Sequence, residues 1–145
     1  MTTTTTPHIT LRISRRFEVP SDRVLDAWLD PAKIRHWMRG ADEVVGVDVD
    51  PRLGGAFSFV VRRQGEDIEH VGEYLELARP KRLAFTWGVP RYSKEASIVR
   101  IECEPAQRGT LLTLTLERVP EEYKTRTEAG WTKILDAMAA SLDII

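Results

Sequence analysis

Three histidines and a single cysteine are the side chains of this sequence best suited to metal binding or nucleophilic chemistry. His8, His36 and His70 are scattered, and none has a second histidine or a cysteine at the spacing that places metal ligands on one face. We therefore expect no metal site and no cofactor. Cys103 is the only cysteine, so no disulfide can form within the chain.

His70 and Tyr74 form a pair whose spacing suits proton transfer. Residues 68–78 have the composition of a strand, and residues four apart in a strand point to the same side. If that side is the interior, the imidazole and the phenol are candidates for an acid–base pair, or for polar anchors in an apolar pocket. The simpler alternative is an exposed histidine, because apolar residues on the opposite face also compete for the interior. These competing residues are Val71, Leu75 and Leu77.

Covalent catalysis and phosphate binding find no support in the motifs. Cys103 falls on the apolar face of a predicted strand, where a thiol is usually inert, and no Gly-x-Ser-x-Gly sequence occurs. Gly54-Gly55 precedes a strand and lacks the lysine of a phosphate loop, so we interpret it as a turn. The basic pairs Arg62-Arg63 and Lys81-Arg82 lie at hairpin ends, where solvated charge is the expected reading.

Length and composition predict one ordinary globular domain. The chain has 145 residues, 42% of them hydrophobic and 30% charged, with a formal net charge of −1. This balance provides no basic field for nucleic acid or anionic membranes, and no apolar run reaches the ~18 residues of a membrane helix. Residues 1–7 lack the features of a secretion signal and are expected to be a disordered tail. The sequence thus predicts a cytoplasmic protein with a single domain at 8–145.

The periodicity of apolar residues predicts a strand, two short helices, a run of strands and one long helix. Apolar and polar residues alternate over 9–17. Apolar residues then recur at helical spacing in two short segments, the first beginning at Ser21, a predicted N-cap, and the second after Asp30, a capping carboxylate that Pro31 follows. Alternation then returns over 45–49, 57–61, 68–78, 83–87, 99–103 and 112–117. Beyond Pro120 the apolar residues fall on one helical stripe. The members of this stripe are Trp131, Ile134, Leu135, Met138, Leu142 and Ile145.

This order of elements predicts an antiparallel sheet curved around the last helix. Six consecutive strands with short connections pair as antiparallel neighbours, and the final helix is the only element long enough to cover their apolar face. Because a large sheet twists, a straight helix cannot fill its whole concave side. We therefore expect an interior space lined by aromatic side chains.

The same residues also resemble a known family. The order of their motifs is similar to the order found in the family of activator of heat-shock protein 90 ATPase homologues. This family belongs to the START-like, birch-pollen-allergen-like helix-grip superfamily, also called SRPBCC. The resemblance covers nearly all of residues 9–142 and implies an α+β helix-grip fold, with six or seven antiparallel strands around the long helix and a deep, largely apolar pocket. It rests on Pro20-Ser21, Ala27-Trp28, Asp30-Pro31, Trp37, Leu53-Gly54-Gly55, Gly72-Glu73-Tyr74, Pro80, Phe85, Trp87, Gly109-Thr110 and Gly130-Trp131.

The leading functional hypothesis is a domain that binds a small hydrophobic or amphipathic molecule. In the loop 88–94, which includes Pro90 and Tyr92, Arg91 is the candidate partner for a ligand carboxylate. One alternative is a cyclase, dehydratase or hydrolase working in the cavity, and another is a module that contacts a chaperone. A homodimer formed through Ile144 and Ile145 or through an edge strand is a further expectation. The candidate ligand-binding residues are Trp37, Phe57, Phe59, Tyr74, Phe85, Trp87, Arg91, Trp131, Leu135 and Met138.

Overall fold

The fold is described here from a computed structural model that covers residues 8–38, 43–91 and 96–142. The expectations placed on residues 1–7, on Tyr92 and on Ile144 and Ile145 lie outside the described residues. The elements are β1 (His8–Phe17), α1 (Ser21–Leu29), α2 (Pro31–Met38), β2 (Glu43–Val49), β3 (Ala56–Arg63), β4 (Glu66–Ala78), β5 (Arg82–Trp87), β6 (Ser97–Ala106), β7 (Gly109–Pro120), the 3-10 turn η1 (Glu121–Tyr123) and α3 (Lys124–Leu142).

One antiparallel sheet of seven strands forms the body of the molecule. Its spatial order is β1-β7-β6-β5-β4-β3-β2, so every strand except β1 lies beside its neighbour in sequence. β1 closes the order by pairing with β7, which leaves β1 and β2 as the two edges. The α+β architecture predicted from the sequence, with two short helices after the first strand and a long C-terminal helix, is confirmed.

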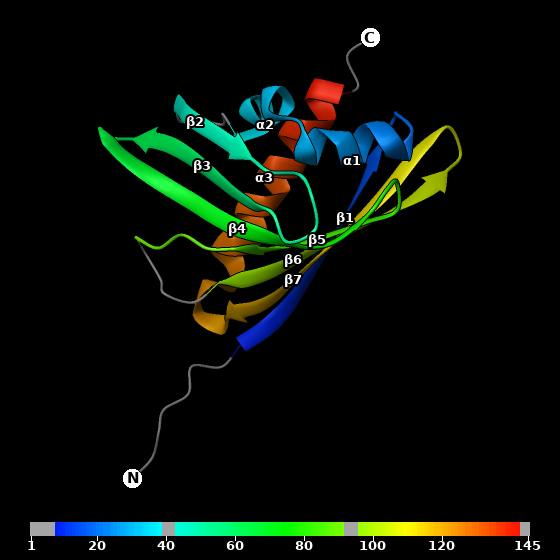
Figure 1. The fold of residues 1–145 in the computed structure, drawn as a ribbon. Coiled ribbons are helices and arrows are strands. Elements are labelled where there is room, and N and C mark those ends of the chain that lie inside the picture. Colours follow the sequence, from blue (N-terminus) through cyan, green and yellow to red (C-terminus); the bar gives the residue numbers. More distant parts are fainter. Residues whose placement is uncertain (1–7, 39–42, 92–95, 143–145) are drawn as a thin grey trace.

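The sheet bends around α3, as Figure 1 shows, with α1 and α2 packed together at one end. Alternation produces this arrangement, because the buried apolar residues of β6 and β7 recur at every second position, on the face toward the helix. On β6 the buried positions include Val99 and Ile101, and on β7 they include Leu112 and Leu114. None of the helices in the described ranges is long and apolar enough to cross a membrane.

The two short helices begin differently from each other. Asp30 caps α2 as predicted, because its Oδ1 accepts a hydrogen bond of 2.9 Å from the backbone N–H of Ala32. The predicted cap at Ser21 is wrong: Ser21 is the first residue of α1, and its hydroxyl lies 3.1 Å from the Thr110 hydroxyl. Thr110 in turn donates to the backbone oxygen of Val19 at 2.8 Å. Ser21 therefore joins α1 to β7 and does not satisfy its own helix end.

The inward face of β4, left open by the sequence, changes along the strand. Ile68 and Tyr74 point inward and are buried, whereas Leu75 is 42% exposed. The pairing of β4 with β5 shifts register between Tyr74 and Glu76, so two successive residues point outward. Leu77 then packs against the core again. Of the competing residues Val71, Leu75 and Leu77, only Leu77, which lies beyond the irregularity, packs against the core.

Candidate functional site

A groove of about 640 Å³ lies between the N-terminal half of α3 and the concave face of the sheet, open to solvent on one side. We call it the α3 groove. Its lining residues come from five strands and two helices, which places it where the curved sheet and the straight helix diverge. The sheet contributes Val61, Arg63, His70, Trp87, Ser97 and Leu116, α2 contributes Trp37 and Met38, and α3 contributes Arg126, Thr127, Ala129, Gly130, Trp131, Lys133, Ile134 and Ala137.

Small side chains on α3 account for the groove. Thr127, Ala129 and Gly130 line the groove with small side chains or none, which leaves space that larger residues would occupy. A Cβ atom added at Gly130 would meet no other atom within 4 Å, so the space beside this residue is open. Further along the helix, Leu135 and Met138 are fully buried and close the gap.

Two indoles in contact form part of the apolar surface of the groove. Trp87 of β5 packs against Trp131 of α3 with ring centroids 5.0 Å apart. On the other side of Trp87 lies His70 of β4, whose ring centroid is 5.3 Å from that of the indole. His70 is half-buried, and its Nδ1 is 3.4 Å from the backbone oxygen of Phe59. The groove thus offers flat, polarizable surfaces with one imidazole among them.

The charged side chains that line the α3 groove are all basic among the described residues. Arg63 continues the inward face of β3, and Arg126 and Lys133 come from α3. Arg126 lies over the ring of Tyr123, with its guanidinium carbon 5.8 Å from the ring centroid. No aspartate or glutamate of the described ranges lines the groove. The groove therefore combines an apolar floor with a positively charged border.

Comparison with known families supports the fold. The sequence profile described as "Activator of Hsp90 ATPase homolog 1-like protein" matches residues 18–143. The chain belongs to this family. The match extends over α1, α2, the whole sheet except β1, and α3. No curated protein matches the chain significantly.

Solved structures of similar proteins share the helix-grip architecture of this Activator of Hsp90 ATPase homolog 1-like chain. Protein CV1439 from Chromobacterium violaceum is 26% identical, with a TM-score of 0.86 over 94% of this chain and 98% of that one. CalU16 from Micromonospora echinospora is 27% identical, with a TM-score of 0.72 over 94% and 78% of the two chains. Mll3558 from Rhizobium loti is 25% identical, with a TM-score of 0.80 over 94% and 98%.

In this family member, the predicted ligand-binding residues other than Arg91 divide into three groups. Trp37, Trp87 and Trp131 line the α3 groove. Leu135 and Met138 lie in the packed core. Four others belong to a closed aromatic cluster, in which a void of only about 10 Å³ remains. These four are Phe57, Phe59, Tyr74 and Phe85, which surround the void together with Trp28 and Trp37.

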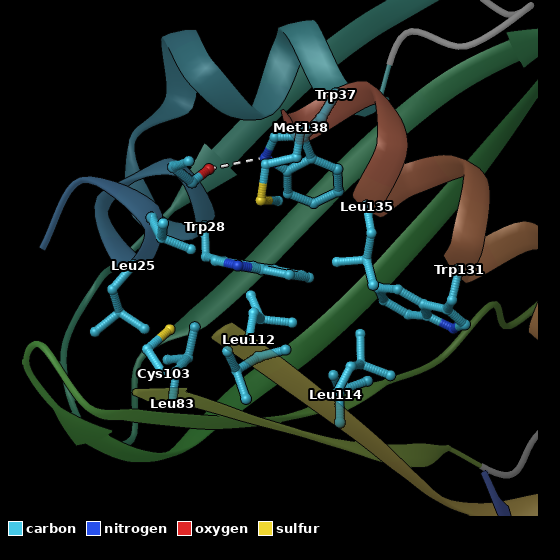
Figure 2. Close-up of a cluster of buried hydrophobic side chains, with 14 of the residues drawn as sticks. Leu25, Trp28, Trp37, Leu83, Cys103, Leu112, Leu114, Trp131, Leu135 and Met138 are labelled. Carbon is cyan, nitrogen blue, oxygen red and sulfur yellow. Dashed lines mark hydrogen bonds between the residues drawn. The ribbon is translucent and has the colours of Figure 1, made fainter. Parts of the chain in front are cut away.

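The aromatic cluster is closed because its rings fill the space between the short helices and the sheet. Phe57 and Phe59 stack with centroids 4.7 Å apart, and Phe57 meets Phe85 edge-on at 5.5 Å. The Trp37 Nε1 donates to the backbone oxygen of Ala27 at 2.8 Å, which holds the end of α2 against α1 (Figure 2). Instead of the deep pocket implied by the family resemblance, the structure has a solid aromatic interior beside an open groove.

The structure does not bring together the predicted acid–base pair. His70 reaches the α3 groove, whereas Tyr74 lies in the aromatic cluster and does not line the groove. The Tyr74 hydroxyl is buried and has no hydrogen-bond partner among the described residues. Burial raises the pKa of Tyr74, and the negative charge of Asp50 adds to this effect. A phenol in this position stays protonated and is remote from a groove-bound substrate.

Arg91, the predicted partner of a ligand carboxylate, forms an ion pair elsewhere. Its guanidinium lies 2.7 Å from a carboxylate oxygen of Glu66, at the turn between β3 and β4. Arg91 is absent from the residues that line the α3 groove. Among the described residues, no group of three histidine, cysteine, aspartate or glutamate side chains could hold a metal ion.

Sequence reasoning missed the three basic residues of the groove. For Arg63 a signal exists, because it continues the alternation of Phe57, Phe59 and Val61 and therefore points inward. On α3, Arg126 and Lys133 are seven residues apart and share one side of the helix. That side is exposed and is turned away from the buried face formed by Trp131, Leu135 and Met138, so the apolar stripe gives no signal for it.

Proposed function

We propose that this protein binds a small hydrophobic or amphipathic molecule in the α3 groove. The observation that carries the proposal is a groove of about 640 Å³ walled by Trp37, Trp87 and Trp131. This volume lies within the ~300–1,000 Å³ typical of small-molecule sites, which are mostly apolar with a few polar groups that fix orientation. The indoles supply the apolar area, and His70 supplies a polar atom beside Trp87.

The rigidity of the surroundings supports the same proposal. The Trp87–Trp131 contact and the filled aromatic cluster hold the groove surface in place without a ligand. A preformed surface loses little conformational entropy when a guest binds, which favours affinity for a small molecule. Trp131 is 4% exposed, so most of its ring serves the core and only an edge is offered to the groove.

The test is a titration with the neutral apolar fluorophore N-phenyl-1-naphthylamine. We expect saturable uptake, with a rise in probe emission and quenching of tryptophan emission. Gly130→Phe places a ring in the open space beside the helix and should abolish uptake while the far-ultraviolet circular dichroism stays unchanged. Gly130→Ala, the matched control, adds only a methyl group and should retain uptake, and it removes a helix-destabilising glycine.

Two results would refute the proposal. One is the absence of saturable uptake by the wild-type protein. The other is equal affinity of the wild type and a folded Gly130→Phe variant, because the probe would then sit outside the α3 groove.

A further inference from the structure

Two basic residues of α3, Arg126 and Lys133, lie on a side of the helix whose other residues have small side chains or none. Arg126, Gly130, Lys133 and Ala137 follow one another at spacings of four, three and four residues, so they form a single stripe along the helix. Two helical turns separate Arg126 from Lys133, or roughly 10 Å along the axis. Gly130 lies between them, and its missing side chain leaves open space at that point.

Neither cation has a carboxylate within ion-pair distance among the described residues. The guanidinium of Arg126 lies over the ring of Tyr123. Some basic residues elsewhere in the molecule are paired, among them Arg15 of β1, which lies 3.4 Å from Asp136 of α3. Asp136, the carboxylate of α3 nearest in sequence to Lys133, is thus already paired with a residue of β1.

We propose that the ligand of the α3 groove is an amphipathic anion, whose apolar body packs on Trp87 and Trp131 and whose anionic head lies over Gly130 between Arg126 and Lys133. This inference rests on the proposed function and adds the chemical class of the guest. Carboxylate, sulfonate and phosphate heads share the chemistry that two flanking cations recognise. A purely anionic molecule would leave the indole surfaces unused, and a neutral one would leave both cations unpaired.

The experiment compares two probes that share one aromatic frame. 1-Anilinonaphthalene-8-sulfonate carries an anionic head, and N-phenyl-1-naphthylamine lacks it. We expect the wild-type protein to bind the sulfonate more tightly, with a preference that declines at high salt because exposed charges are screened. Each of Arg126→Gln and Lys133→Gln should weaken sulfonate binding about threefold and the double variant about tenfold, the magnitudes of solvent-accessible ion pairs. Binding of the neutral probe should change less than twofold.

The matched control is Arg108→Gln, which removes one positive charge from the turn between β6 and β7. This turn is at the opposite end of the hairpin from the groove residue Ser97, so the variant should keep the full sulfonate preference. Inorganic phosphate at equal ionic strength should not displace the sulfonate probe, because the head alone lacks the apolar contacts.

The possible failures are distinguishable. If the neutral probe binds in the groove but the double variant keeps the sulfonate preference, or the wild type has none, the anionic head is refuted and the proposed function stands. If displacement by inorganic phosphate is complete, the site is an anion site without an apolar body, which also refutes the inference. If neither probe binds, or Gly130→Phe affects neither, both proposals fail together.

Discussion

The indole of Trp87 meets the indole of Trp131 at an interplanar angle of 62°, with ring centroids 5.0 Å apart. This contact joins the middle strand β5 to α3 at the floor of the groove. Trp131 also stacks on Trp28 of α1 at 6.2 Å, so one side chain connects a strand and two helices. The indole of Trp131 therefore contributes both to the surface of the α3 groove and to the packing of the fold.

Replacing Trp131 by alanine should therefore destabilise the whole domain. We expect Trp131→Ala to lower the free energy of unfolding by about 3–5 kcal/mol, the usual cost of deleting a buried tryptophan. Tyr123→Ala, at an exposed aromatic residue just before the same helix, should change it by less than about 0.5 kcal/mol. Urea denaturation followed by circular dichroism measures both, and similar values for the two variants would contradict the assigned role of Trp131.

Gly72 of β4 is a second position on which packing depends. A Cβ atom there would collide with the backbone oxygen of Thr86 and with the ring of Phe57. Since a paired strand cannot move its carbonyl away freely, Gly72→Ala should cost about 1–3 kcal/mol of stability. Gly46→Ala in β2, where an added Cβ meets nothing within 4 Å, is the matched control and should be close to neutral. Equal thermal midpoints for the two variants would show that the close approach at Gly72 does not hold.

The buried hydroxyl of Tyr74 should be dispensable for folding. It has no hydrogen-bond partner among the described residues, and an unsatisfied buried hydroxyl costs free energy. Tyr74→Phe keeps the ring and its contact with Phe57, and should raise the free energy of unfolding by about 1 kcal/mol. Denaturant titration checks this prediction. A loss of more than about 1 kcal/mol would instead reveal a partner for the hydroxyl in solution.

Stability should fall at alkaline pH because of Cys103. Burial raises the pKa of its thiol to about 12, whereas an unfolded thiol titrates near pH 8.5–9. Between these values the unfolded chain releases a proton that the folded chain retains, so rising pH favours unfolding by up to ~1.4 kcal/mol per pH unit. Below about pH 8 the group contributes no pH dependence.

Urea titrations at a series of pH values from neutral to alkaline measure this slope. Cys103→Ala should be less stable at neutral pH, because it leaves a small cavity, but its stability should fall less steeply above about pH 9. Parallel curves for the variant and the wild type would assign the alkaline slope to other groups. Tyr74→Phe offers a separate comparison, since the raised pKa of Tyr74 acts in the same direction at higher pH.

Much of the fold could be predicted from the sequence because burial follows a regular period. Alternation in β6 and β7 identified inward residues such as Val99 and Leu114, and Asp30 marked the start of α2. β4 could not be assigned in the same way, since the register shift after Tyr74 reverses the alternation within one strand. Such a shift depends on pairing with β5, which local sequence does not specify.

The site was less predictable because volume is a property of three-dimensional packing. Phe57 and Trp87 are both aromatic residues on inward faces, yet one fills the interior and the other borders the groove. Composition cannot separate these outcomes, because they depend on how far α3 stands from the sheet. Lys133 was equally hard to predict, since a lysine on the exposed side of an amphipathic helix is normally only a solvated charge.

The open stripe along α3 keeps the residues of the proposed binding site apart from those that hold the fold. Arg126, Gly130 and Lys133 are exposed and contribute little to the core, so the chemistry of the groove can diverge among relatives by substitution on one helix face. The filled cluster around Phe57 then remains a constant platform. Under the proposed function, substitutions on this helix face should change which molecule binds while the melting behaviour stays nearly the same.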